Sequence, residues 1–359
     1  MLERIQKAQK AINRACRQLG YQINLMEVCG THTVAIFRHG IKSILPKQLR
    51  LLSGPGCPVC VTDQSYIDIV LELADHDNCL IATYGDMIRV PGKAGSLETK
   101  RTAANVRIVL SSEDVLQLAK DNPKKNVVFV AVGFETTAPA TAVAVKEAAE
   151  QNIDNFFVLS GHKLVVPAMR ALLAEKNHNI DGFLCPGHVS VIIGYGAFAE
   201  IVEDFARPCV VAGFEPVQII EGLAEICQQL QAGKAELGSV YSAVVTEKGN
   251  TAAQKMIAEV FEPVDGYWRG LGKIEKSTLQ LKDKYSRFDA FKRFGMTETA
   301  SEDVSGCRCG EVLCGLIDPP ACALFGRDCT PQTPVGPCMV SSEGTCAAWF
   351  KYGRMGDTR

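Results

Sequence analysis

Cysteines gather at the C-terminal end of this 359-residue chain, where seven of the fifteen fall in the last 53 residues. Four of these are widely spaced, at Cys307, Cys322, Cys329 and Cys346. Thiolates from four separate loops can enclose a [4Fe–4S] cluster, whereas a zinc staple usually shows two close Cys-x-x-Cys pairs. The spacing favours the cluster, with zinc as the alternative. Cys309 and Cys338 then remain as candidate redox thiols beside it.

A second sulfur pattern is the segment GPGCPVC at 54–60, which contains Cys57 and Cys60. It follows a predicted strand and opens a predicted helix, the placement of a thioredoxin-like dithiol. Helix N-terminal amides lower the pKa of the first thiol and favour the thiolate. The pair is therefore predicted to form a reversible disulfide. The alternative is one half of a zinc site, but no second pair lies nearby in the sequence.

A third pattern, CGTHT at 29–33, also follows a predicted strand and places a single cysteine three residues before a histidine. Cys29 is a candidate soft-metal ligand or nucleophile, and the start of the next helix favours its thiolate. His32 is positioned to orient that thiolate or take a proton. The alternative is a packed cysteine followed by a helix-capping threonine.

Polar side chains stand in further loops that follow predicted strands, and they are candidate supports for a ligand site. They are Asp86 and Arg89 in GDMIRVPG, Glu135 and Thr136 in GFETT, His162 in SGHK and His188 in PGHVS. Each has a purely structural alternative: a turn ion pair, a helix N-terminal cap, and two hydrogen-bonded loop histidines. Their common place at one predicted sheet edge, where α/β proteins bind ligands, favours a joint role.

Apolar runs such as NVVFVAVG and NFFVLSG alternate with helical patterns, which predicts parallel sheets in an α/β fold. Two α/β lobes are expected, at 21–121 with CGTHT and GPGCPVC, and at 122–231 with GFETT and PGHVS. A mostly irregular or helical [4Fe–4S] domain is expected at 232–359, together with an amphipathic helix at 1–20.

Composition removes several classes of function. The net charge of -2 offers no basic surplus for nucleic acid or an anionic membrane. No apolar run reaches the ~18 residues that span a bilayer, and the N-terminus lacks a secretory signal pattern, so a cytoplasmic protein is expected. The sequence has no Walker A loop and no GxGxxG, which argues against a nucleotide or nicotinamide enzyme. The remaining cysteines lie in apolar surroundings typical of core positions, except Cys314, which stays unassigned.

Five motifs taken together, CGTHT, GPGCPVC, GFETT, PGHVS and GPCMVSSEGTCAAW, resemble the signature of the HypD family over about residues 22–350. The resemblance implies a factor that assembles the Fe(CN)2CO unit of [NiFe] hydrogenases. It implies two α/β lobes and a third domain with one [4Fe–4S] cluster, similar to that of ferredoxin:thioredoxin reductase. It also implies two partners: HypC, which shares the iron, and HypE, which supplies cyanide.

Carried onto this chain, the resemblance makes Cys29 the ligand of the iron that receives cyanide and CO, with His32 beside it and a HypC cysteine as the second thiolate. It makes Cys57 and Cys60 a dithiol that accepts or relays electrons. The four widely spaced cysteines become cluster ligands, and Cys309 with Cys338 a second redox pair. The expected protein is a redox-active scaffold rather than a turnover enzyme. A cluster-fed thiol–disulfide reductase and a zinc-stapled interaction protein are the alternatives.

Overall fold

Two parallel sheets organise the chain in a computed structural model that describes residues 1–101, 105–175, 178–301 and 306–353. The first sheet has the strand order β2-β1-β7-β8-β9 and the second the order β4-β3-β5-β6. Their strands are β1 (Ile23–Glu27), β2 (Leu49–Ser53), β3 (Cys79–Thr83), β4 (Val106–Ile108), β5 (Asn126–Gly133), β6 (Phe156–His162), β7 (Gly182–Pro186), β8 (Cys209–Ala212) and β9 (Leu237–Ser239). Every neighbouring pair is parallel, which confirms the predicted α/β class with parallel sheets.

Helices cover both sheets because the strands are apolar on both faces; β1 and β3 are buried along their whole length. The described helices are α1 (Leu2–Leu19), α2 (Gly30–Arg38), α3 (Pro58–Val61), α4 (Gln64–Ala74), α5 (Leu97–Lys100), α6 (Ser112–Asp121), α7 (Ala138–Glu150), α8 (Val165–Ala174), α9 (Gly187–Ile193), α10 (Ala199–Phe205), α11 (Pro216–Gln231), α12 (Thr251–Val260), α13 (Ala290–Phe294), α14 (Cys309–Leu313), α15 (Pro337–Val340) and α16 (Thr345–Tyr352). None of these described helices is long and apolar enough to cross a membrane.

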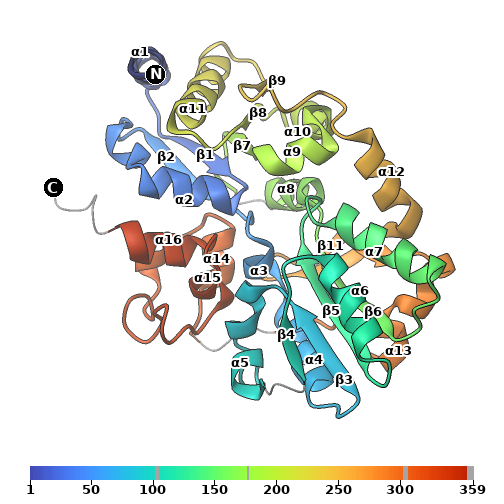
Figure 1. Cartoon of the computed structure of the whole chain (residues 1–359). Coiled ribbons are helices and arrows are strands. Elements are labelled where there is room, and N and C mark those ends of the chain that lie inside the picture. The colour runs from blue at the N-terminus through green and yellow to red at the C-terminus, as the bar shows by residue number, and fades with distance from the viewer. Residues whose placement is uncertain (102–104, 176–177, 302–305, 354–359) are drawn as a thin grey trace.

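The sheets divide the chain differently from the predicted lobes 21–121 and 122–231. The chain leaves the first sheet after β2, builds the whole second sheet, and returns at β7, which pairs with β1 (Figure 1). The local pattern of a strand shows that it belongs to a parallel sheet but not which strand it pairs with. The boundary at 121/122 therefore does not coincide with a sheet boundary.

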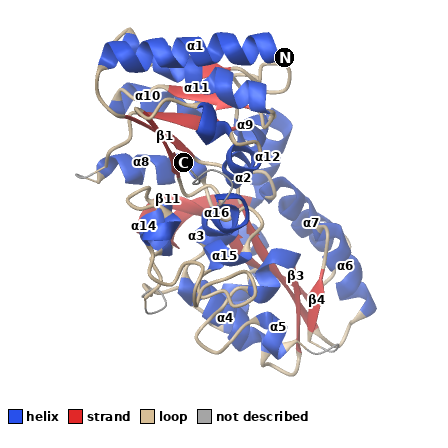
Figure 2. Cartoon of the chain, turned by 90° about the vertical axis from the view of Figure 1, so that its left-hand side faces the viewer, coloured by secondary structure: helices blue, strands red, loops and turns tan. Residues whose placement is uncertain are grey.

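The amphipathic helix 1–20 forms as expected, but it does not pack against residues 306–353, which we call the cysteine-rich segment. The buried stripe of α1, including Ile12 and Cys16, packs against α11 over the first sheet (Figure 2). An ion pair of 2.6 Å between Arg4 and Glu221 joins the same two helices.

The segment after residue 260, expected to be irregular, begins with a regular antiparallel hairpin of β10 (Phe261–Trp268) and β11 (Gly272–Leu281). The hairpin lies against β6, where Ser160 Oγ donates to the Leu279 carbonyl at 2.6 Å. Only the part from residue 306 onward has the short helices and long loops that the sequence indicates. Its last helix, α16, packs on α2, with the rings of Trp349 and Phe37 5.0 Å apart.

Candidate metal and redox sites

A cavity of about 450 Å³ lies where strand ends of the two sheets meet, and we call it the interlobe cavity. Its walls come from the loops after β1, β2, β3, β5 and β7 and from the loop 341–343 of the cysteine-rich segment. Among the predicted site residues, those that line it are Cys29, Asp86, Thr136 and His188. Four of the predicted site residues, from loops of both sheets, thus line one cavity, and their joint role in binding a ligand stays a prediction.

Cys29 is the N-cap of α2 and is 9% exposed. Burial raises the pKa of its thiol to about 12, and the helix N–H groups only partly oppose this. The carboxylates of Glu343 and Glu27 raise it further. The expected effect of the helix start is present but is outweighed by burial, so the metal-free thiol is protonated. A soft metal cation that binds there must displace this proton.

Glu27, which the sequence reasoning did not single out, holds the Cys29 turn in place. It is 3% exposed, its Oε2 accepts the Cys29 N–H at 3.1 Å, and its Oε1 accepts the Thr33 hydroxyl. Burial raises its pKa to about 8. A carboxylate at the end of the apolar run YQINLMEV was the signal available in the sequence, because an acid is rarely buried without a partner.

His32 is fully buried and does not line the interlobe cavity. Its Nε2 lies 3.2 Å and 3.0 Å from the carbonyls of Ala212 and Gly213, so Nε2 carries the proton and ties α2 to the end of β8. Burial lowers its pKa to about 4 and keeps the ring neutral. His188 lines the cavity instead, and its ring lies against that of Phe214, with the ring centroids 4.2 Å apart.

Cys57 and Cys60 form a disulfide at the start of α3, with their Cα atoms 5.2 Å apart. The predicted bridging distance is confirmed. Both residues are buried, Cys57 at 3% and Cys60 at 0% exposure. The preceding residue, Gly56, packs against the Cys29 backbone so closely that a Cβ would lie 2.1 Å from the Cys29 nitrogen. The disulfide loop and the Cys29 loop are therefore in direct contact.

The loop 341–343 joins the cysteine-rich segment to both sheets. Asp86 accepts hydrogen bonds from Ser341 Oγ at 3.0 Å and from the N–H and hydroxyl of Ser342 at 3.2 Å. On the other side, Thr31 Oγ1 donates to Glu343 Oε1 at 2.6 Å. The structure thus shows Asp86 tethering a loop of the cysteine-rich segment.

Arg89, the suggested ion-pair partner of Asp86, has other partners. It lies 3.6 Å from Glu98 and donates to the Pro331 carbonyl. It too therefore contacts the cysteine-rich segment rather than forming a turn ion pair with Asp86.

The GFETT turn presents its residues to different places. Thr136 lines the interlobe cavity, whereas Glu135 faces a separate cavity near α8 and α12. Glu135 Oε1 accepts the Val165 N–H at 2.9 Å, and burial raises the pKa of its carboxyl to about 7. His162 is fully buried and lies 3.0 Å from the Thr141 hydroxyl, and burial lowers its pKa to about 3. Glu135 thus bonds the first residue of α8 rather than capping α7, which follows it, and His162 is hydrogen-bonded as in its structural alternative.

Six of the seven C-terminal cysteines converge in the cysteine-rich segment. Five line one small cavity: Cys307, Cys309, Cys322, Cys329 and Cys346. Cys338 lies against them, because the sulfurs of Cys309, Cys338 and Cys346 are all within 4.8 Å of one another. Thiolates are the ligands of iron–sulfur clusters, and the convergent sulfurs exceed the four that a [4Fe–4S] cluster takes. The residues present therefore fit such a cluster.

The closest set of three thiols differs from the predicted ligand set, with which it shares only Cys346. Cys338 is fully buried, and hydrogen bonds from Cys309 and Cys346 lower the pKa of its thiol. The Cys346 N–H also donates to the Cys338 sulfur at 3.2 Å. A stabilised thiolate beside a second thiol is the arrangement that thiol–disulfide exchange needs. Cys314 lies apart from this cavity and donates to the Gly270 carbonyl at 3.4 Å.

The two sulfur sites are neighbours, because α15, which carries Cys338, packs on α3, which carries Cys60. A family model described as "HypD: Hydrogenase formation hypA family" matches residues 3–353. This chain belongs to the HypD family. It is 46% identical over 332 residues to the hydrogenase maturation factor HypD of Escherichia coli K12, covering 92% of this chain and 89% of that protein.

More distant relatives extend the match. The HypD of Cupriavidus necator is 41% identical over 353 residues, or 96% of this chain and 93% of that protein. A putative hydrogenase expression/formation protein of Methanocaldococcus jannaschii is 41% identical over 352 residues, 98% of each chain. Membership of the HypD family assigns this chain a role in hydrogenase maturation.

Proposed function

We propose that this HypD-family chain is the scaffold on which the Fe(CN)2CO unit of [NiFe] hydrogenases is assembled, with the iron as cargo bound by Cys29. The observation that carries the proposal is the position of Cys29. It is the one cysteine among the described residues that line a cavity of about 450 Å³ at the strand ends of both sheets. The cavity has room for an iron and small diatomic ligands.

One thiolate does not complete the coordination of this iron. A thiolate is the soft donor that low-spin iron with cyanide and CO needs, and the other donors must come from outside the cavity wall. HypC is the proposed source of the second thiolate. Binding replaces the Cys29 proton with iron, because the thiol is protonated in the metal-free protein. Glu27 holds the Cys29 backbone in place, and the buried His32 fixes α2 through its hydrogen bond to the Gly213 carbonyl.

HypE is the proposed donor of cyanide, which arrives as a thiocyanate on a HypE cysteine. Release of cyanide from a thiocyanate takes two electrons. The Cys57–Cys60 pair exchanges two electrons between its dithiol and disulfide forms and lies in the loop against Cys29. We therefore assign the dithiol form the role of reductant. The dithiol is oxidised to the disulfide when cyanide is released.

The cysteine-rich segment is the proposed source of these electrons. A [4Fe–4S] cluster held by Cys307, Cys322, Cys329 and Cys346 supplies single electrons when bound. Cys309 and Cys338 are the proposed second dithiol, because their sulfurs lie within 4.8 Å of each other and Cys338 lies on the helix that packs against α3.

A zinc-stapled interaction protein is the second candidate, favoured by the three thiols of Cys309, Cys338 and Cys346 within 4.8 Å of one another. A cluster-fed thiol–disulfide reductase would use the same dithiols on free disulfide substrates. Anaerobic purification separates these functions. A brown protein with about four irons per chain supports the cluster, and a colourless zinc protein supports the staple. Turnover of small disulfides by the isolated chain supports the reductase.

Infrared spectroscopy of the chain purified with HypC tests the proposal itself. Bound CO and cyanide give stretching bands in a window that is free of protein absorption. Such bands, lost when HypC is omitted, are the expected result. A cluster-loaded chain that shows no such bands when purified with HypC from cells making active hydrogenase would contradict the proposal.

A further inference from the structure

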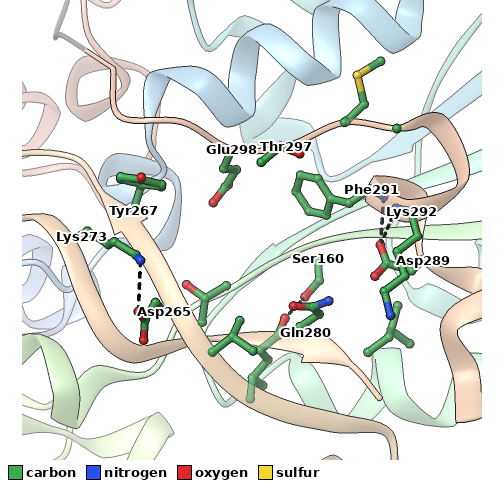
Figure 3. Close-up of a pocket in the computed structure, with 16 residues that line it drawn as sticks. Ser160, Asp265, Tyr267, Lys273, Gln280, Asp289, Phe291, Lys292, Thr297 and Glu298 are labelled. Atoms are coloured by element: carbon green, nitrogen blue, oxygen red, sulfur yellow. Dashed lines mark hydrogen bonds and ion pairs between the residues drawn. The ribbon is translucent and has the colours of Figure 1, made fainter. Parts of the chain in front are cut away.

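A cavity of about 600 Å³ lies apart from both sulfur sites, between the β10–β11 hairpin, β6 and the segment 289–298 (Figure 3). It shares no lining residue with the interlobe cavity. Tyr267 and Phe291 contribute aromatic rings to its wall, and Ser160 and Thr278 also line it. Nothing in the proposed scaffold function uses this cavity.

The lysines at the cavity are engaged by aspartates. Lys273 Nζ lies 3.1 Å from Asp265, and Lys292 Nζ lies 3.1 Å from Asp283. Behind the wall, the buried Lys163 donates to the Tyr267 carbonyl at 2.9 Å and to Thr278 Oγ1 at 3.1 Å. These three lysines are therefore already engaged in ion pairs or hydrogen bonds with protein groups.

Two carboxyl groups on the wall retain unused acceptor atoms. Asp289 is 2% exposed; its Oδ1 accepts the N–H groups of Phe291 at 2.9 Å and Lys292 at 3.4 Å. Its Oδ2 is buried and has no hydrogen-bond partner among the described residues, so a ligand reaches it only after a small movement of the cavity wall. Figure 3 shows the Glu298 side chain directed into the cavity, and no hydrogen bond from the described part of the chain reaches its carboxylate. Burial raises the pKa of both groups.

We propose that this cavity binds an organic cation, with a primary ammonium or guanidinium group held by Asp289 and Glu298 and an apolar body against Tyr267 and Phe291. Carboxylates whose acceptor atoms are unused gain charge-assisted hydrogen bonds from such a group. Aromatic faces attract cations as well. An anion would meet two carboxylates. Among the described residues, the lysines nearby are engaged by protein groups, and the charge of the buried Lys163 already acts on Glu298. The same chemistry is offered by a free amine and by a lysine or arginine side chain of a partner protein.

Isothermal titration calorimetry of the full, cluster-loaded chain tests the proposal with defined probes. Benzylamine, agmatine and a short arginine peptide are the cations, and benzyl alcohol is the neutral match for benzylamine. One-to-one saturable binding of a cation is expected, with no heat from benzyl alcohol. Affinity should fall as the pH is lowered, because the two carboxyl groups must be ionised to hold a cation.

Glu298→Gln keeps the volume of the side chain and removes its charge, so it should weaken binding by about tenfold or more. Asp289→Asn keeps the cap of α13 and should weaken binding similarly; if it fails to fold, Glu298→Gln decides alone. Glu275→Gln, an exposed acid of the same hairpin outside the cavity, is the matched control and should leave binding unchanged.

Preference for benzylamine or agmatine over the peptide would identify a free amine as the ligand class, and the reverse would identify a partner's side chain. The proposal is overturned if no cation binds at millimolar concentration, if benzyl alcohol binds as tightly as benzylamine, or if Glu298→Gln binds as the unaltered chain does.

Discussion

The loops at the interlobe cavity and the cysteine-rich segment hold their sulfur atoms in place by different means. Cys29 and Cys57 stand in loops directly after β1 and β2, and backbone contacts and the buried Glu27 fix them. The segment 306–353 has only short helices, and its sulfurs meet across long loops. A site built on a sheet edge keeps its shape without metal, whereas a site built from loops depends on metal to hold them together. The first is therefore suited to exchangeable cargo, and the second to a permanent cofactor.

Removing a proposed cluster ligand should give the largest effect. Cys346→Ser should reduce iron from about four per chain to almost none, abolish the visible absorption, and make 306–353 sensitive to protease while the two sheets stay folded. Iron analysis, absorption spectra and limited proteolysis measure this. Cys314→Ser, a cysteine outside the cluster cavity, is the control. Loss of the cluster in Cys309→Ala or Cys338→Ala, with retention in Cys307→Ala, would show that the proposed ligand set is wrong.

Removing the Cys57–Cys60 disulfide should have a moderate effect on stability. Cys57→Ser opens a loop of four residues and should lower the free energy of unfolding of the oxidised protein by about 2 kcal/mol. Thiol counting in denaturant checks the pairing: reduction should add two thiols in the unaltered chain and none in the variant. The cluster absorption should persist, and its loss would show that the two sulfur sites are not independent.

The pH dependence of stability should report on the buried Glu135 in the sheet region. Its pKa is raised from 4.5 to about 7, so the folded chain binds this proton more tightly than the unfolded chain does. Its contribution is fully present below about pH 4.5 and is lost as the pH rises through about 7. Glu135→Gln should therefore reduce the decline in stability across this window by about 1–3 kcal/mol. Urea unfolding at several pH values measures it, with Glu275→Gln as the exposed control; an equal decline in both variants would contradict the prediction.

The tether between the two regions should give the smallest effect. Asp86→Ala removes the acceptor of hydrogen bonds from Ser341 and Ser342 and should cost about 1 kcal/mol. Amide hydrogen exchange in 341–346 should accelerate, while exchange in β1 and β5 stays unchanged. Unaltered exchange in the loop would show that Asp86 does not hold it.

The sequence was sufficient for what depends on local pattern. Continuous apolar strands predict the parallel sheets, and the position of GPGCPVC predicts a pair at bridging distance. The distance of 5.2 Å between the Cα atoms of Cys57 and Cys60 confirms that pair. The gathering of cysteines near the C-terminus predicts one thiol-rich site, and six sulfurs do converge there.

Features that depend on pairing across the chain could not be predicted in this way. Nothing local to β7 shows that it returns to β1, or that α1 packs on α11. The protonation state and exposure of a side chain likewise depend on burial, which is known only for the folded chain. It raises the pKa of Cys29 against the effect of the helix start, and it places His32 behind the cavity and His188 on its wall.

The most direct test of the central claim is the infrared spectrum of the Cys29→Ala protein purified anaerobically with HypC. Cys29 does not line the cavity of the proposed cluster ligands, so the cluster absorption should be retained. The CO and cyanide bands should disappear, because Cys29 is the proposed ligand of the cargo iron. Cys79→Ala, which replaces a buried cysteine on β3, is the control and should keep the bands. Persistence of the bands in Cys29→Ala would contradict the account and move the iron to Cys57 or Cys60.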